Sequence, residues 1–424
     1  MCSQDHAHQW MLCPQCDLTV ELPTMAPGQR ARCPRCHTTL ATNWSDPGKR
    51  PVAYAIAALV MLLLANLFPF VNMHVSGISS EIGLMQIPRV MVNEDYSSLA
   101  TIFLLLVQGI PACCMLLILL LMTNLPLPLP HTLRGGLARV LFQLKNWGMA
   151  EIFMAGVLVS FVKLMAYGDI GLGTSFWPWC LFCMMQLRAI QCVDRRWLWQ
   201  RIAPQPALPH QPQGGISGLE QGLRSCSCCT AVLPVGQLSC PRCGVTGHAR
   251  RKHSLQWTLA LLFTSVMLYI PANILPIMLT NTLGSEHNSN IMAGVILLWS
   301  DGSYPIALVI FIASIMVPSL KMLAIGWLCW DAKGYGRGDR EKMHLIYEVV
   351  EFVGRWSMID VFVVAVLSAL VQMGRLMSIN PGIGALLFAV VVILTIFAAM
   401  AFDPRLTWDI KHKNTLKEPS VDGQ

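Results

Sequence analysis

Eight of the sixteen cysteines stand in four closely spaced pairs, a spacing typical of a metal site. Two residues separate the thiols of each pair. The pairs form two groups, one near the N-terminus and one near the middle of the chain: Cys13, Cys16, Cys33 and Cys36, then Cys226, Cys229, Cys240 and Cys243. Two C-x-x-C pairs joined by a short segment have the ligand spacing of a zinc ribbon. The sequence therefore predicts two tetracysteine zinc sites, with rubredoxin-like iron as the alternative.

The second group contains one additional cysteine, because its first pair reads CSCC. The two-residue spacing selects Cys226 and Cys229 and leaves Cys228 as a spare thiol. Four thiolates fill a tetrahedral metal and leave no position for a reacting water, so we expect structural sites. Disulfides are the alternative, but they need an oxidising compartment, and the charge pattern described below places both groups in the cytosol.

Eight long apolar runs separate and follow these cysteine groups. The chain is 54% hydrophobic and 12% charged, which is far from the composition of a soluble protein. A transmembrane helix needs about 20 apolar residues, and runs of this kind occupy residues 51–72, 99–122, 150–168, 174–193, 255–278, 305–330, 359–374 and 380–402. The sequence predicts an all-α polytopic membrane protein with eight transmembrane helices. Nothing before the first run resembles a cleavable signal peptide, so we expect none to be removed.

The flanking charges predict the orientation of these helices. Basic residues flank the runs on one side, among them Lys49, Arg50 and Arg134. In the loops on the other side, residues 73–98 and 169–173, most of the charged residues are acidic. Lysine and arginine concentrate in the cytoplasmic segments of membrane proteins. Both termini and the central linker are therefore expected in the cytosol. The formal net charge of +7 follows from this topology and does not indicate a nucleic-acid partner.

The chain is made of two copies. Cys36 and Cys243 are 207 residues apart (243 − 36 = 207), and Trp147 and Trp356 are 209 apart (356 − 147 = 209). A register kept over this length indicates an internal duplication. Because four spans per copy is an even number, the two four-helix repeats must be parallel, each preceded by a cytosolic zinc ribbon.

The duplication predicts the domain boundaries. A segment rich in proline, glutamine and glycine between the copies should be an extended, exposed linker. The predicted parts are ribbon 1 (residues 1–48), transmembrane module 1 (49–200), the linker (201–222), ribbon 2 (223–248), transmembrane module 2 (249–410) and a polar tail (411–424).

Lys163 lies within an otherwise apolar run, where a charge costs about 2.5–3.5 kcal/mol on insertion scales. Helical spacing places Gly156, Ser160 and Tyr167 on the same face. Small and hydroxyl residues on one face indicate contact with other helices. We therefore expect Lys163 to face the bundle interior or a cavity, with a snorkelling anchor as the alternative. Asp169 should lie at the outer end of this span, at the mouth of the cavity.

Three further ionisable residues lie in the predicted spans. Lys321 is three residues after Pro318, about 13 Å from the cytosolic end of its span, and the proline leaves a polar opening in the helix. Glu151 and Asp360 occupy matching places at the expected cytosolic start of the third and seventh spans. They either stabilise a helix N-terminus or pass protons inward. With Lys163 and Asp169, these three residues are candidates for lipid head-group contact or proton coupling.

A second cysteine motif lies inside the predicted fourth span. Cys180 and Cys183 form WCLFC, and a membrane thiol oxidoreductase could use such a pair to exchange electrons with quinone. Their counterparts in the second copy, Ala389 and Val392, are not cysteines. This difference favours packing as their role.

The motifs that would drive chemistry with ATP are absent from the sequence. There is no G-x-x-x-x-G-K-[ST] phosphate loop and no kinase or hydrolase signature. We therefore expect no enzyme, and any work must be passive or driven by ion gradients.

Over essentially the whole chain, the order of these motifs resembles the paraquat-inducible protein A (PqiA) family. The strings that carry the resemblance include ANLFPFVNM, LFQLKNWGMAEIF, LYIPANILPIM, IYEVVEFVGRWSMIDVFV and FDPRLTWD. The resemblance implies a multi-pass inner-membrane protein of Gram-negative bacteria that works with an MCE-domain protein, PqiB, and an outer-membrane lipoprotein, PqiC. In such a system the MCE partner forms a periplasm-spanning tunnel.

Sequence and resemblance together predict a subunit that loads phospholipid into the tunnel, or receives it, and so contributes to envelope integrity. Two alternatives stay open. One is a membrane redox or stress sensor that uses Cys180 and Cys183. The other is a structural anchor that only holds the MCE partner in place.

Overall fold

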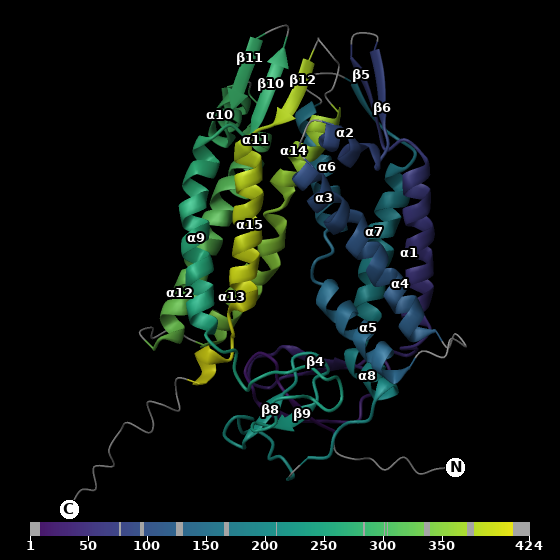
Figure 1. The fold of residues 1–424 in the computed structure, drawn as a ribbon, viewed down its shortest axis with the longest axis vertical. Coiled ribbons are helices and arrows are strands. Elements are labelled where there is room, and N and C mark those ends of the chain that lie inside the picture. The colour runs from purple at the N-terminus through teal and green to yellow at the C-terminus, as the bar shows by residue number, and fades with distance from the viewer. Residues whose placement is uncertain are drawn as a thin grey trace, which may run out of the picture.

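The structure is a computed structural model that describes most of the chain, including both cysteine groups and the larger part of every predicted span. The described residues are 9–75, 78–93, 97–123, 130–164, 169–208, 210–282, 285–300, 302, 304–334, 340–370 and 377–409. Figure 1 shows upright helices with the cysteine ribbons at one end and small β-sheets at the other. We call these the ribbon end and the sheet end.

Five helices in the described residues are long and apolar enough to cross a membrane. They are α1 (Arg50–Leu67), the continuous helix Ser97–Met122, α9 (Ser254–Ile274), the helix Ile312–Ala332 and α15 (Ile383–Ala401). Three other predicted spans contain shorter helices, α6 (Ala150–Leu164), α7 (Phe176–Cys192) and α14 (Ile359–Leu370). The mostly helical membrane class is therefore shown, while crossing by all eight spans stays a prediction.

Corresponding elements recur in residues 50–202 and 254–409, which we call module 1 and module 2. Helix α5 (His131–Leu144) corresponds to α13 (Arg340–Trp356), α6 to α14, and α7 to α15. A π-helical segment also recurs. In module 1, α3 (Ser97–Phe103) continues through η1 (Leu104–Gly109) into α4 (Ile110–Met122), and in module 2, α11 (Tyr304–Phe311) continues through η2 (Ile312–Met316) into α12 (Val317–Ala332).

Proline explains the position of both π-helical segments. Pro111 and Pro318 stand at the second residue of α4 and α12, directly after η1 and η2. Proline has no N–H to donate to the preceding turn, so the regular i→i−4 ladder cannot continue through it. A widened turn just before the proline is one way to absorb this defect within a continuous helix.

The sheet end carries two three-stranded antiparallel sheets, which the all-α prediction did not include. Their strand orders match, β6-β5-β7 and β11-β10-β12. The strands are short and without clear alternation, so the sequence gives little signal for them. They are β5 (Val71–Val75), β6 (Ile78–Ile82), β7 (Asp169–Leu172), β10 (Met278–Thr282), β11 (Ser285–Ser289) and β12 (Met377–Pro381).

Matching glycines let the chain pass closely beside each sheet. A Cβ atom at Gly173 would overlap the carbonyl of Pro69, and one at Gly382 would overlap the carbonyl of Pro276. The same close approach in both modules fixes the ends of α1 and α9 against the start of α7 and α15. Glycine is required at both positions because no side chain fits there.

The two modules meet through α6 and α14 near the sheet end (Figure 1). Phe362 of α14 lies edge-to-face on Phe153 of α6, with ring centres 6.0 Å apart, and on Phe103 at 6.1 Å. A Cβ atom at Gly156 would lie 3.1 Å from that of Phe362, and Ser160 is fully buried. The stripe of small residues predicted on α6 therefore contacts a helix of the other module.

Both cysteine groups form small two-stranded ribbons at the ribbon end. Ribbon 1 contains the hairpins β1 (Gln9–Leu12) with β2 (Thr19–Leu22) and β3 (Arg30–Arg32) with β4 (Thr39–Thr42), and ribbon 2 contains β8 (Leu223–Ser225) with β9 (Val232–Pro234). Leu12 of ribbon 1 packs on Leu223 and Val232 of ribbon 2. The short helix α8 (Arg195–Ile202) leads from module 1 towards them.

The predicted linker is only partly an open connector. Residues 215–219 are hydrogen-bonded to ribbon 1, where Thr19 N–H donates to the carbonyl of Ile216 and Gly218 N–H donates to that of Asp17. The expectation of a wholly extended and exposed segment was therefore wrong for this part. The reason is that the backbone of ribbon 1 offers an unpaired edge, to which the chain adds.

Candidate metal centres and buried polar sites

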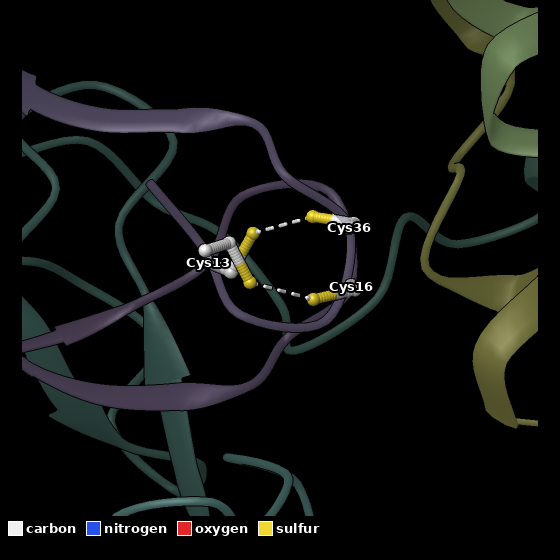
Figure 2. Close-up of side chains that lie close together, drawn as sticks. Cys13, Cys16 and Cys36 are labelled. Atoms are coloured by element: carbon white, nitrogen blue, oxygen red, sulfur yellow. Dashed lines mark hydrogen bonds between the residues drawn. The ribbon is translucent and has the colours of Figure 1, made fainter. Parts of the chain in front are cut away.

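Each cysteine group brings four thiols together in a buried cluster. In ribbon 1 the Sγ atoms of Cys13 and Cys36 are 3.4 Å apart and those of Cys16 and Cys33 are 3.5 Å apart. Figure 2 shows the thiol of Cys36 pointing towards that of Cys13, with Cys16 beside them. In ribbon 2 both of the corresponding pairs, Cys226 with Cys243 and Cys229 with Cys240, are at 3.5 Å.

The backbone explains why the C-x-x-C spacing makes these clusters. In all four pairs, the carbonyl of the first cysteine accepts from the N–H of the residue just after the second cysteine. That residue has a left-handed backbone, with φ of 60°, 58°, 57° and 73° at Asp17, His37, Thr230 and Gly244. The repeated turn aims both thiols of a pair to the same side. It also selects Cys229 over Cys228, as the spacing predicts.

The thiol geometry fits a tetrahedral metal. All four Sγ atoms of each cluster lie within 4.8 Å of one another, and ideal Zn–S bonds of about 2.3 Å place sulfurs about 3.8 Å apart. A four-thiolate set suits zinc or iron. Both clusters can therefore hold a metal ion, as predicted, and the donor set alone does not choose between these metals.

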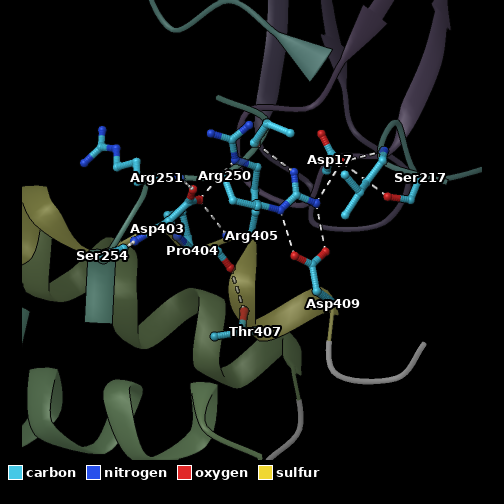
Figure 3. Close-up of polar contacts among 12 residues, drawn as sticks. Asp17, Ser217, Arg250, Arg251, Ser254, Asp403, Pro404, Arg405, Thr407 and Asp409 are labelled. Atoms are coloured by element: carbon cyan, nitrogen blue, oxygen red, sulfur yellow. Dashed lines mark hydrogen bonds and ion pairs between the residues drawn. The ribbon is translucent and has the colours of Figure 1, made fainter. Parts of the chain in front are cut away.

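Ribbon 1 docks under module 2, which the sequence did not predict. Arg250, just before α9, lies 2.9 Å from the carboxylate of Asp17, the residue after Cys16, and 2.7 Å from that of Asp409 (Figure 3). Burial alone would lower the pKa of Arg250, but Asp409 and Asp17 outweigh it and raise the pKa above its usual value. Arg250 thus joins ribbon 1 to the end of module 2.

Two more contacts complete the docking of ribbon 1. The guanidinium of Arg35, in the second C-x-x-C turn, lies over the ring of Trp408 at 4.4 Å. Thr38 Oγ1 is 3.0 Å from Nε2 of His344 in α13, and the same nitrogen is 3.2 Å from Glu348. Cys36 Sγ also contacts Thr38 Oγ1 at 3.4 Å, so one hydroxyl links the cluster to module 2.

Ribbon 2 docks under module 1 in the same manner. Arg242, which stands 207 residues after Arg35 (242 − 35 = 207), donates to the carbonyl of Ala203 at 3.0 Å. Arg195 of α8 reaches the carbonyl of Ser227 at 3.5 Å. The thiols of ribbon 2 belong to the same buried cluster as Trp199 of α8. Each ribbon therefore lies under the module of the other copy.

Lys321 is the best-defined ionisable group inside the helices. It is 3% exposed, and its Nζ donates to Thr395 Oγ1 at 2.9 Å and to the carbonyl of Gly354 at 3.4 Å. Both of these partners are uncharged. A Cβ atom at Gly354 would lie 2.9 Å from Nζ, so the absence of a side chain there makes room for the ammonium group. Lys321 is therefore buried inside module 2.

Glu151 does not lie at the ribbon end of its span, where we expected it. The helix breaks at residues 145–149, and there Met149 N–H donates to Leu106 O, while Gly148 is close to Pro111. Pro111 is eleven residues from the end of α4 (122 − 111 = 11), or about 16 Å. Glu151 thus begins a helix at mid-depth, because the chain before it forms α5 instead of an external loop.

The remaining ionisable candidates are described only through their backbones. Asp360 is the second residue of α14, after a break that matches the one before α6. Lys163 is in α6, and Asp169 begins β7 opposite His74 of β5. The side chains of Lys163, Asp169 and Asp360 lie outside the described residues. Whether they contribute to a site stays a prediction.

Cys180 and Cys183 lie in α7 as free thiols, one half-buried and the other buried. Their counterparts in α15, Ala389 and Val392, are 0% and 1% exposed. The same positions are thus core positions in module 2, which supports packing as the role of the two cysteines.

Within the described residues, five helices able to cross a membrane and two tetracysteine ribbons define a polytopic membrane protein with two candidate metal centres. A family profile described as "Paraquat-inducible protein A" matches residues 49–203 and 255–411. The chain belongs to this PqiA family. The two matched segments begin 206 residues apart (255 − 49 = 206), close to the period of the sequence repeat.

Curated relatives match along almost their full length. The chain is 67% identical over 409 residues to the Intermembrane transport protein PqiA of Escherichia coli strain K12, covering 96% of this chain and 98% of the relative. It is 29% identical over 402 residues to the Lipophilic envelope-spanning tunnel protein A of the same strain, covering 94% of this chain and 90% of the relative. A Probable intermembrane transport protein of Haemophilus influenzae is 26% identical over 412 residues, covering 94% of this chain and 95% of the relative. No solved structure matches.

Proposed function

We propose that this protein is the inner-membrane subunit of a system that moves phospholipid between two membranes, without catalysing a reaction. The observation that carries the proposal is the 67% identity, over 96% of the chain, to a protein named for intermembrane transport. The name of a more distant relative, a lipophilic envelope-spanning tunnel protein, supports a lipid-like cargo. In this proposal an MCE-domain protein, PqiB, forms the periplasm-spanning tunnel. The lipoprotein PqiC contacts the far end of that tunnel at the outer membrane.

The proposed topology has eight membrane-crossing segments in two parallel repeats. The ribbon end, both termini and the linker face the cytosol, because the basic flanks of the spans lie at that end. The sheet end then faces the periplasm and is the surface available to the MCE partner. The boundaries proposed from the sequence are kept, with the qualification that residues 215–219 belong physically to ribbon 1.

The proposed role of the ribbons is structural. A zinc ion in each thiol cluster would add stability to hairpins that have only a small hydrophobic core of their own. Cys13, Cys16, Cys33 and Cys36 would hold one ion, and Cys226, Cys229, Cys240 and Cys243 the other.

The proposed transport residues are the buried ionisable groups. Lys321 has the strongest support, because a buried ammonium bonded only to neutral described partners is costly in a membrane and is retained for a task. Glu151 lies at mid-depth next to the helix break. Lys163, Asp169 and Asp360 are kept as candidates for head-group contact or proton coupling.

Complementation of a strain with an envelope defect tests this proposal. Lys321→Met should abolish complementation, whereas Lys333→Met should not, because Lys333 is an exposed lysine at the end of the same helix. Photoreactive residues along α6 and α12 should capture phospholipid in cells. Intact complementation by Lys321→Met would remove this lysine from the mechanism, and failure to capture lipid at any position would argue against phospholipid transport itself.

A redox or stress-sensing function is the alternative supported by a specific motif, the pair in α7. Replacing both Cys180 and Cys183 by alanine separates the functions, since only redox sensing predicts a loss of activity. The third function, an anchor that only holds the MCE partner, predicts that no intramembrane charge matters.

A further inference from the structure

A groove opens on module 1 between two helices that are long and apolar enough to cross a membrane, α1 and the helix that contains η1 and α4. It encloses about 460 Å³, a volume in the range of small-molecule sites. Its walls are almost entirely aliphatic, and none of the described lining residues is charged: Leu59, Leu62, Leu63, Asn66, Met85, Leu104, Gln108, Gly109 and Ala112. From Leu59 to Asn66 the groove follows α1 for about 10 Å towards the sheet end.

Two amide side chains in this groove each have one buried atom without a hydrogen-bond partner among the described residues. Gln108 is 5% exposed, and its Nε2 donates no hydrogen bond. Asn66 donates from Nδ2 to the carbonyl of Leu62, but its buried Oδ1 accepts none. A buried polar group without a partner is costly, and more so beside hydrocarbon, where no water can replace the partner. Both atoms are buried behind the apolar wall, so the groove has one unpartnered donor and one unpartnered acceptor that a turn of the amide side chains would bring to its surface.

Module 2 has a larger side chain at the matching position, and this side chain bridges the same two helices. Tyr269 stands at the position of Leu62 (269 − 62 = 207). Its hydroxyl donates to the carbonyl of Ile315, the residue that matches Gln108, at 3.2 Å, and Ser319 donates to the same hydroxyl at 3.3 Å. The repeat thus shows what a closed version of this site looks like.

We propose that this groove binds one phospholipid molecule that is being transported. One acyl chain lies along the aliphatic wall, and the Gln108 side chain turns on binding so that its Nε2 donates to an ester carbonyl near the glycerol. An ester is the matching chemistry because the site offers amide groups and no described cation for a phosphate. The open side faces the bilayer, so lipid can enter laterally. This inference rests on the proposed function, of which it specifies the entry site.

Crosslinking in cells tests the site with the full chain. A photoreactive benzoyl-phenylalanine replaces Leu63, which is 63% exposed and lines the groove, and the attached phospholipid is quantified by mass spectrometry. Leu62→Tyr copies the closed module and should reduce the adduct at least tenfold. Gln108→Leu keeps the apolar wall and removes one neutral hydrogen bond, so a reduction of about fivefold is expected.

Val60→Tyr is the matched control, because it adds the same ring on α1 at a position outside the groove that is 47% exposed. This variant should leave the adduct unchanged. An unchanged adduct in both Leu62→Tyr and Gln108→Leu would overturn the site. If Leu62→Tyr fails to fold, the Gln108→Leu result decides alone.

Transport measured in the same strains separates this inference from the proposed function. A lost adduct with intact complementation by Leu62→Tyr would show a static lipid site and overturn the assignment as a cargo site, leaving the proposed function standing. If the unaltered protein transfers no phospholipid between membranes, the proposed function fails, and a groove adduct then reports only a resident lipid, which also overturns the cargo assignment.

Discussion

Removing Arg250 should release ribbon 1 from module 2. Asp17 is 1% exposed on its side chain and accepts from Arg250 at 2.9 Å, from the hydroxyl of Ser217 at 3.3 Å and from the N–H of Leu219 at 3.1 Å. Arg250→Ala removes the only charged partner of these three and leaves a buried carboxylate. Breaking a buried ion pair costs about 3–5 kcal/mol. We use the lower end, about 3 kcal/mol, because two hydrogen bonds to Asp17 remain and Arg250 is itself 14% exposed.

Hydrogen–deuterium exchange measures this effect locally. A loss of about 3 kcal/mol corresponds to roughly 100-fold faster exchange, if opening of ribbon 1 limits exchange. The acceleration should be confined to ribbon 1, to residues 215–219 and to the strands of ribbon 2 that pack on Leu12, and the C-x-x-C turn at Cys240 should be unaffected. Lys252→Ala is the matched control, since Lys252 is an exposed cation two residues away. Unchanged exchange in Arg250→Ala would refute the crossed docking of the ribbons.

Three other predictions follow from the described contacts. The purified chain should contain two metal ions, and a strong chelator should increase exchange in both ribbons while leaving the helices protected, as measured by metal analysis and exchange. Gly354→Ala should destabilise the protein by about 1–3 kcal/mol by displacing the ammonium of Lys321, and Lys321→Met should restore the thermal stability of that variant. Burial would raise the pKa of Asp403, but Arg405 and the N–H of Arg251 outweigh it, so the pKa lies below its usual value. The stability that this carboxylate contributes is therefore fully present above about pH 4 and is lost as the pH falls further. Asp403→Asn should therefore make the free energy of unfolding, measured as a function of pH, less dependent on pH in this acid range.

The cysteine clusters were predictable because their chemistry is local. A C-x-x-C pair makes its turn from its own backbone, and the left-handed residue after it, such as Thr230, needs no distant partner. The repeat likewise carries information in the sequence itself. Pro111 and Pro318, found at one offset, end the same π-helical segment in both modules.

The docking of the ribbons was not predictable from the same sequence. Arg35 and Arg250 look like ordinary basic flanks of membrane spans, and nothing local shows that one stacks on Trp408 while the other binds Asp17. Such contacts join residues more than 200 positions apart, so only the assembled fold reveals them. The depth of Glu151 was misjudged for a related reason, since the break between α5 and α6 is fixed by a contact between residues far apart in sequence, the hydrogen bond from Met149 N–H to the carbonyl of Leu106 in η1.

The two modules differ at matching positions, and these differences indicate that the modules have different roles. Where module 2 places Lys321, module 1 has Cys114, and where module 1 has an open groove beside Leu62, module 2 has Tyr269. If packing alone decided these residues, we would expect similar side chains in both modules, because the π-helical segments, the prolines and the close-approach glycines are the same in both. A buried cation in one copy and an apolar groove in the other therefore indicate separate tasks. We expect groove variants such as Gln108→Leu to reduce lipid capture at Leu63, and Lys321→Met to leave that capture unchanged although it abolishes complementation. Loss of the Leu63 adduct in Lys321→Met would refute separate tasks.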